Sequence, residues 1–326
     1  MEKNKDKRKR PELGLKPLLA AILIILAIFL IVLYLNRPEK KNAAKGTIVC
    51  TFFPVYDVVN DLMEGTGYDV INMTSGVSGC IHDYQITTKD MKALEKADLF
   101  VANGMGMEHF LENVAKNFKN LPVVYMTDAF EEAQPMNRAG HVEDEVNAHL
   151  WMDPEAFLEE IEYLETVLCK RFPDAAERIT SNKNRYSRDA IDAKDKAKEM
   201  SNLYSGYADP ESAVGKIYAI SFNESFEVLA EKLEIEIIAG FSLDENEQPS
   251  AGEVAEAIAE AKNIKNVLVL IEEDKKAEAD KILNETDAKV VYLSSLTSGK
   301  DADGLPKGIW KNLIEIETVV DTFIEK

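Results

Sequence analysis

The sequence predicts an α/β fold in which two parallel-sheet lobes are joined by a long rigid helix and preceded by one N-terminal transmembrane helix. Short apolar runs alternate with helical segments in two separate regions of the chain, and this alternation is typical of parallel sheets. Residues 154–204, between those regions, show a helical pattern without a strand. Near the N-terminus, residues 17–35 contain no charge.

The uncharged run "PLLAAILIILAIFLIVLYL" at residues 17–35 is long enough to cross a bilayer as one helix. Residues 1–16 carry seven Lys or Arg and three Asp or Glu, and this positive excess predicts a basic cytoplasmic tail. A cleaved signal peptide is the alternative, but no A-x-A-like site follows the run. No cysteine directly follows it either, so a lipoprotein anchor is not indicated. We therefore expect a single-pass cell-membrane protein whose C-terminal part, after a linker at residues 36–45, is extracytoplasmic.

The first lobe is predicted over residues 46–153. Its strand candidates are "TIVCTFF" (47–53), "YDVINM" (68–73), "DLFVA" (98–102) and "PVVYM" (122–126). Helical segments fall between them, at about 55–64, 88–96 and 106–118. Because helices separate the strands, we expect the strands to run parallel.

A helical spine is predicted over residues 154–204. Asp153 and Pro154 form a favourable start, an N-cap followed by proline at the first helical position, and Pro173 breaks this first helix. A second, longer helix then runs to about residue 204. Its apolar residues are spaced 4-3-4-3-4 and so fall on one face: Tyr186, Ala190, Ala193, Ala197, Met200 and Tyr204.

The second lobe, residues 205–326, repeats the pattern of the first. Its strand candidates are "KIYAI" (216–220), "EIEIIA" (234–239), "NVLVLI" (266–271) and "AKVVYL" (288–293). Helical segments lie between them, one of them opened by the capping box "SAGE" at residues 250–253, and a final helix covers about 308–324.

The charge of the chain excludes one class of partner. The formal net charge is −20, and since residues 1–16 contribute +4, the remainder carries −24 by subtraction. So acidic a body would be repelled by the phosphates of nucleic acid, whereas it suits a protein that meets cations. We expect a monomer that does not bind nucleic acid.

Four polar side chains follow predicted strands at the ends where ligands collect in open parallel sheets. They are His82, His149, Asn223 and Ser294. A cleft between two lobes would bring the four loops together.

Three of these positions, those of His82, His149 and Asn223, also have an ordinary explanation. A histidine in a loop is usually just solvated, His149 is able to pack beside Trp151, and Asn223 is placed to cap a helix. The other two histidines give less information. His109 lies in a helical segment and is expected at the surface, and His141 lies in "AGHVEDEVNAH", either a metal-collecting loop or an acidic surface loop.

Three cysteines, Cys50, Cys80 and Cys169, are too few for a disulfide framework. Outside the cell Cys50 and Cys80 could pair if they lie close together, and buried free thiols are the alternative.

Several motifs in order resemble the solute-binding proteins of zinc and manganese ABC transporters, from about residue 46 to the end. The segments that carry the resemblance are "TFFPVYDVV", "GCIHDYQITTKDMKALEKADLFVANGMGMEHFL", "NAHLWMDP", "DENEQPSAGEV" and "VLVLIEED". This resemblance implies two α/β lobes joined by a rigid helix, with Zn²⁺ or Mn²⁺ bound between the lobes as cargo for a membrane permease.

The resemblance also implies four metal ligands. The first two match His82 and His149. In "NESF" the third falls on Asn223, where the family has His or Glu. In "YLSSL" the fourth falls on Ser294, where the family has an acid. Two neutral imidazoles, an amide and a hydroxyl offer no negative charge, so metal binding weaker than the family norm, or none, is expected. The possible substitutes are Glu224, Asp83, Cys80 and His141, which the sequence does not rank.

Three hypotheses follow. The first is a membrane-anchored protein that captures Zn²⁺, or alternatively Mn²⁺, for an ABC permease, with two histidines favouring zinc. The second is a degenerate member of the family that binds metal weakly or not at all and acts as a protein-binding module. An enzyme is disfavoured, because no Ser-His-Asp set, P-loop or H-E-x-x-H motif is present.

Overall fold

The computed structural model describes seven stretches of the chain: residues 15–35, 44–75, 81–130, 147–207, 216–241, 249–299 and 303–324. The chain divides into two compact units, Met1–Ala43 and Ala44–Lys326. In the first unit, helix α1 (Leu15–Leu35) has exposed apolar side chains, among them Leu23 and Ile25. Across the stretches that the structure describes, no helix meets the length and hydropathy required of a membrane span, so the transmembrane helix expected at residues 17–35 is not confirmed.

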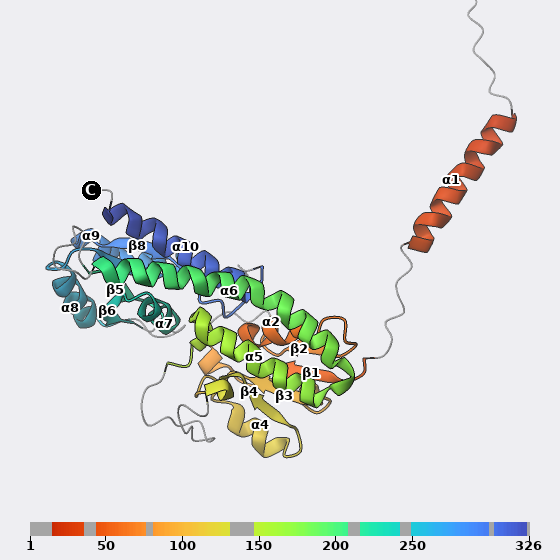
Figure 1. The fold of residues 1–326 in the computed structure, drawn as a ribbon, viewed down its shortest axis with the longest axis horizontal. Helices are drawn as coiled ribbons and strands as arrows, with labels where there is room; N and C mark the ends of the chain where they lie inside the picture. Colours follow the sequence, from red (N-terminus) through yellow and green to blue (C-terminus); the bar gives the residue numbers. More distant parts are fainter. Residues whose placement is uncertain are drawn as a thin grey trace, which may run out of the picture. The chain divides into compact units, whose positions relative to one another are not determined.

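The first sheet has four parallel strands in the order β2-β1-β3-β4 (Figure 1). The strands are β1 (Thr47–Cys50), β2 (Asp69–Asn72), β3 (Leu99–Ala102) and β4 (Val123–Tyr125). The connecting helices are α2 (Phe53–Leu62), α3 (Thr88–Leu94) and α4 (Leu111–Asn117), with short 3-10 turns η1 (Ile81–Asp83) and η2 (Met126–Phe130). The central strand β3 is buried throughout and reads as a continuous apolar run, as expected for a parallel sheet covered on both faces.

The second sheet repeats this topology, with the order β6-β5-β7-β8. Its strands are β5 (Tyr218–Ser221), β6 (Glu236–Gly240), β7 (Val267–Ile271) and β8 (Lys289–Tyr292). Its helices are α7 (Glu224–Lys232), α8 (Ala251–Ala261), α9 (Lys276–Glu285) and α10 (Leu305–Ile324), and η5 (Glu273–Lys275) precedes α9. The predicted two-lobed α/β fold is therefore confirmed, whereas the exact lobe boundaries at residues 153 and 205 stay predictions.

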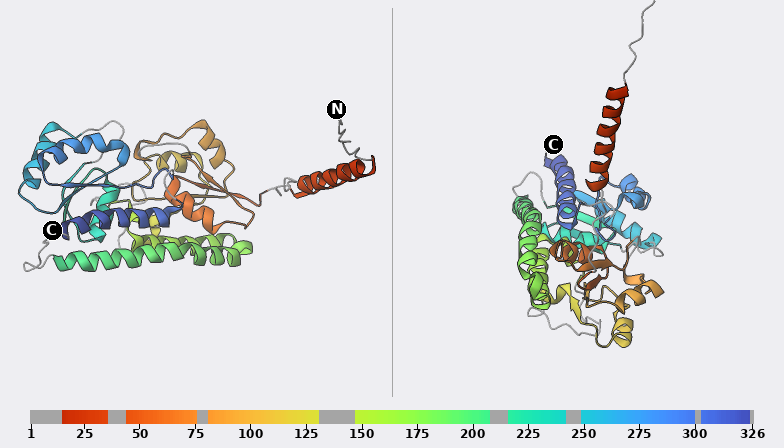
Figure 2. Two further views of the ribbon diagram at one scale, coloured as in Figure 1. Left: turned by 90° about the horizontal axis from the view of Figure 1, so that it is seen from above. Right: turned by 90° about the vertical axis from the view of Figure 1, so that its right-hand side faces the viewer.

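Two consecutive helices form the spine, α5 (Pro154–Arg171) and the 32-residue α6 (Ala176–Tyr207). Asp153 caps α5 by accepting hydrogen bonds from the backbone of Glu155 and Ala156, and η4 (Pro173–Ala175) separates the two helices. All six residues of the predicted apolar stripe on α6 are buried. This face packs against α2, α5 and α10, and Figure 2 shows α6 running along both lobes.

Contacts besides the spine join the lobes. The Asp57 carboxylate of α2 accepts hydrogen bonds from the Tyr186 hydroxyl, at 2.6 Å, and from the backbone N–H of Leu305, at 2.7 Å. One side chain thereby ties the first lobe to the spine and to the start of α10. Gly299 also lies against the first lobe, since a Cβ built there would overlap the Phe53 ring. With these connections, the lobes are expected to move only slightly relative to each other.

The helix expected over residues 106–118 begins later, at Leu111. The reason is the backbone of Gly104, Met105 and Gly106, whose φ angles of 94°, 52° and 80° are incompatible with a right-handed helix. The resulting turn carries residues that matter for the site described next.

Candidate metal centre

Three side chains with metal-binding atoms converge between the lobes: His82, His149 and Glu224. Their donor atoms all lie within 4.8 Å of one another. His82 lies in η1 after β2, His149 directly precedes η3 (Leu150–Met152) after β4, and Glu224 is the first residue of α7 after β5. Each therefore follows a strand at its carboxyl end, where side chains from separate loops of parallel sheets meet.

The two imidazoles are close to the separation that a shared ion requires. Their ring centroids are 6.0 Å apart. Two imidazoles on one tetrahedral Zn²⁺ would have centroids roughly 5 Å apart, given Zn–N bonds of about 2.0–2.1 Å. A shift of about 1 Å, within the range of a side-chain adjustment, would bring both rings onto one ion.

His149 is held as a neutral imidazole. It is 7% exposed, and burial, with a smaller effect from His82, lowers its pKa to about 3. Its Nδ1 lies 2.7 Å from Oδ1 of Asn147. Because an amide oxygen only accepts, Nδ1 carries the proton and Nε2 keeps its lone pair for a ligand.

Asn147 connects the lobes at this point. Its Oδ1 also accepts the backbone N–H of His149, at 3.0 Å, while its Nδ2 donates to the carbonyl of Glu224, at 2.9 Å. The same side chain therefore orients a histidine of one lobe and fixes the backbone of the carboxylate residue of the other. Such outer partners commonly set the orientation of metal-binding side chains.

The Trp151 ring packs against the His149 ring. The two rings are 5.0 Å apart between centroids, and the indole is fully buried. Its Nε1–H donates to the carbonyl of Ser295 in the second lobe, at 3.4 Å, and Phe52 meets it edge-on.

A buried carboxyl group, Glu108, organises the turn after β3. It accepts hydrogen bonds from the Thr51 hydroxyl, at 2.8 Å, and from the backbone N–H groups of Asn103 and Gly104, at 2.7 and 3.0 Å. Burial raises its pKa despite these donors. Asn103 in turn donates to the carbonyl of Ala148, at 3.0 Å, and so fixes the chain just before His149.

Asn223 and Ser294, the other two expected ligands, have structural partners of their own. Oδ1 of Asn223 accepts the backbone N–H of Ser225, at 2.9 Å, and so caps α7. The Ser294 hydroxyl accepts the N–H of Leu296, at 3.3 Å, and Asn312 binds the Ser294 backbone. The carboxylate beside the cap, Glu224, is the side chain that joins the histidines.

The other possible ligands and the cysteines named from the sequence are described only in part. His141, Cys80 and the side chain of Asp83 lie outside the described residues, and with them the question of a Cys50–Cys80 pair. Among the described residues, Cys50 and Cys169 form no disulfide; Cys50 is buried, which raises its pKa.

His109 is exposed, as expected, but it is not remote. Its ring lies 5.5 Å from that of His82 between centroids. Residues 106–118 were expected to form one continuous helix. The proximity of His109 to His82 was therefore not predicted, because it depends on the turn before α4.

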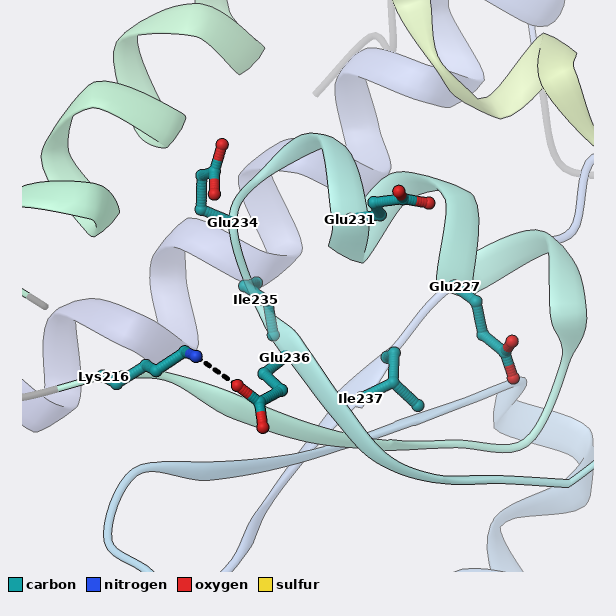
Figure 3. Close-up of a pocket in the computed structure, with 7 residues that line it drawn as sticks. All are labelled: Lys216, Glu227, Glu231, Glu234, Ile235, Glu236 and Ile237. Atoms are coloured by element: carbon teal, nitrogen blue, oxygen red, sulfur yellow. Dashed lines mark hydrogen bonds and ion pairs between the residues drawn. The ribbon is translucent and has the colours of Figure 1, made fainter.

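An acidic groove lies on the second lobe along β6 (Figure 3). It has a volume of about 370 Å³ and is lined by Lys216, Glu227, Glu231, Glu234, Ile235, Glu236 and Ile237. Lys216 forms an ion pair with Glu236, and burial raises the pKa of Glu227 to about 6. None of the three converging donors lines this groove, which therefore belongs to a different part of the lobe.

The chain is similar to several known proteins. The sequence profile described as zinc-uptake complex component A, periplasmic, matches residues 48–319. The high-affinity zinc uptake system protein ZnuA of Bacillus subtilis is 24% identical over 306 residues, covering 89% of this chain and 92% of that protein. The manganese-binding lipoprotein MntA of Halalkalibacterium halodurans is 29% identical over 108 residues, 33% of this chain and 34% of that protein.

Solved structures share the fold. The periplasmic zinc binding protein TroA from Treponema pallidum superposes with a TM-score of 0.68 at 18% identity, covering 85% of this chain and 99% of that one. This likeness concerns the two parallel-sheet lobes and the long helix.

Proposed function

Because the chain belongs to the family of zinc-uptake complex component A, periplasmic, we propose that it captures Zn²⁺ between its lobes and delivers it to the permease of an ABC transporter. Mn²⁺ is the alternative cargo. The family consists of metal-binding solute-binding proteins and not of enzymes, in agreement with the expectation from the sequence.

The observation that carries the proposal is the convergence of His82, His149 and Glu224. Two imidazoles and one carboxylate form a donor set that suits Zn²⁺, which takes three protein ligands and one further position in open sites. Mn²⁺ favours sites richer in oxygen, so this set supports zinc.

In this proposal Glu224 stands at the third position in place of Asn223. The sequence pattern suggested a site without negative charge, and the carboxylate beside the N-cap supplies that charge. Water would complete the coordination in place of Ser294, whose hydroxyl accepts a backbone hydrogen bond. The alternative, a degenerate member that binds metal weakly or not at all and acts as a protein-binding module, was based on the lack of such a charge.

We further propose that α1 holds the protein at a membrane, with residues 44–326 on the extracytoplasmic side. The support is the apolar sequence of α1, whose described side chains from Ile22 to Val32 are exposed. Exposed apolar surface of this extent favours transfer into lipid. The full chain should pellet with membranes after cell lysis, and a chain that begins at Ala44 should not; membrane binding by both would contradict an anchoring role of α1.

Calorimetric titration of the metal-free full chain in mild detergent tests the capture proposal. Zn²⁺ should bind with one ion per chain and with higher affinity than Mn²⁺. His82→Ala and His149→Ala should each weaken this binding strongly while the far-UV circular dichroism is preserved. Zinc affinity that is unchanged in both variants would place the cation elsewhere.

A further inference from the structure

We propose that His109 and His82 form an outer binding site, where a divalent cation docks before it moves to the inner group of His82, His149 and Glu224. The proposal rests on the proposed function, since it describes how the same ion arrives. The centroids of the His109 and His82 rings are 5.5 Å apart, nearer than the 6.0 Å between His82 and His149. Both distances approach the roughly 5 Å expected of two imidazoles on one Zn²⁺.

The exposure of the three imidazoles decreases along the proposed path. His109 is exposed, His82 is half-buried, and His149 is 7% exposed. Removing a divalent ion from water in one step is costly, because charged groups lose their hydration before protein ligands replace it. An exposed first ligand lets the ion exchange its waters one at a time.

His82 belongs to both pairs of rings, so a moving ion would keep one protein ligand throughout. Only its partner would change, from His109 on the solvent side to His149 on the buried side. This handover requires no movement of the lobes, consistent with the links through Asp57 and Gly299.

The backbone that carries His109 is fixed, although the side chain is exposed. Its neighbours Glu108 and Phe110 are 2% and 5% exposed. Glu108 is held by Thr51 and by the turn after β3, and the Phe110 ring packs edge-on against Tyr84, which lies two residues after His82. The outer pair is therefore built on anchored backbone from two loops, which favours a site over a chance contact.

The kinetics of zinc capture test this inference. Trp151 lies beside His149 and should report the arrival of Zn²⁺ at the inner site by a change in fluorescence. The full chain in mild detergent, carrying Trp310→Phe to remove the second tryptophan, would be mixed with ZnCl₂ in a stopped-flow instrument. Zinc release would be followed after addition of an excess of chelator.

His109→Ala should slow both association and release by roughly threefold or more, while Kd stays within about twofold, because an intermediate site lowers the barrier in both directions. Asn113→Ala, a neutral change at an exposed position of α4, should alter neither rate. Unchanged rates in His109→Ala would overturn the inference. So would a Kd weakened as strongly as in His149→Ala, since His109 would then be a ligand of the final site.

The two proposals fail in different ways. If the unmodified chain binds no Zn²⁺, the capture function is wrong. If it binds Zn²⁺ through His149 and the rates do not depend on His109, only the outer site is wrong.

Discussion

The two lobes share one strand order but contribute to the site differently. The first lobe supplies two imidazoles, one of them fixed by Asn147, Trp151 and the network around Glu108. The second lobe supplies one carboxylate, Glu224, at the exposed start of a helix. The first lobe therefore provides the nitrogen ligands, one of them oriented and neutral, while the second provides the charge, and the Asn147 amide joins the two at the site.

The largest effect is expected from the first lobe. His149→Ala should weaken Zn²⁺ binding by roughly 100-fold or more, since it removes one of three proposed ligands that is already oriented. Isothermal titration would measure the loss. Ser294→Ala, the matched change in the second lobe, should leave Kd within about twofold; equal losses would show that both lobes supply essential ligands at these positions.

The contribution of the second lobe is tested by removing its charge. Glu224→Gln should weaken Zn²⁺ binding by about 10- to 100-fold, because the amide keeps the shape but lacks the negative charge. Competition with a zinc chelator would measure the change in Kd. An unchanged affinity would refute the assignment of Glu224 as a ligand.

One of the links between the lobes, the one at the site, can be broken at Asn147. Asn147→Ala removes the acceptor that orients His149 and the donor to the Glu224 carbonyl, and should weaken Zn²⁺ binding by about tenfold. Asn117→Ala, an exposed asparagine on α4, is the matched control. A loss in both variants would point to a general effect on folding.

The buried imidazole should also appear in the pH dependence of stability. The pKa of His149 is lowered in the folded chain, so on acidification the unfolded chain takes up a proton that the folded chain does not. Below about pH 6.5 and down to about pH 3, stability should therefore fall, by up to about 1.4 kcal/mol per pH unit from this group.

Chemical denaturation of the metal-free protein, compared with His149→Gln at pH 7, 6 and 5, would measure this term. The variant should lose less stability on acidification than the unmodified chain. Parallel pH profiles would contradict a His149 that stays neutral in the folded state.

The smallest effect concerns Asn223. Asn223→Ala should lower the free energy of unfolding by about 1 kcal/mol through loss of the α7 cap, with little change in Zn²⁺ affinity. Urea denaturation and zinc titration of the same preparation would separate the two. A large loss of affinity with unchanged stability would make Asn223 a ligand after all.

Sequence patterns predicted the two sheets, the spine and the convergence of His82 with His149. The strands follow from local periodicity, and side chains that follow parallel strands meet at their carboxyl ends. They did not predict which residue of "NESF" faces the histidines. That choice depends on the cap: once the Asn223 oxygen binds the helix backbone, the next side chain is the one directed to the site. The approach of His109 to His82 was missed for a similar reason, since it depends on three consecutive positive φ angles.

X-ray absorption at the zinc edge of the loaded full chain tests the central claim most directly. Two imidazole nitrogens at about 2.0–2.1 Å and carboxylate or water oxygens at about 2.0–2.2 Å are expected, with one oxygen lost or changed in Glu224→Gln. A sulfur atom at about 2.3 Å, or a first shell without two imidazoles, would contradict a site built from His82, His149 and Glu224.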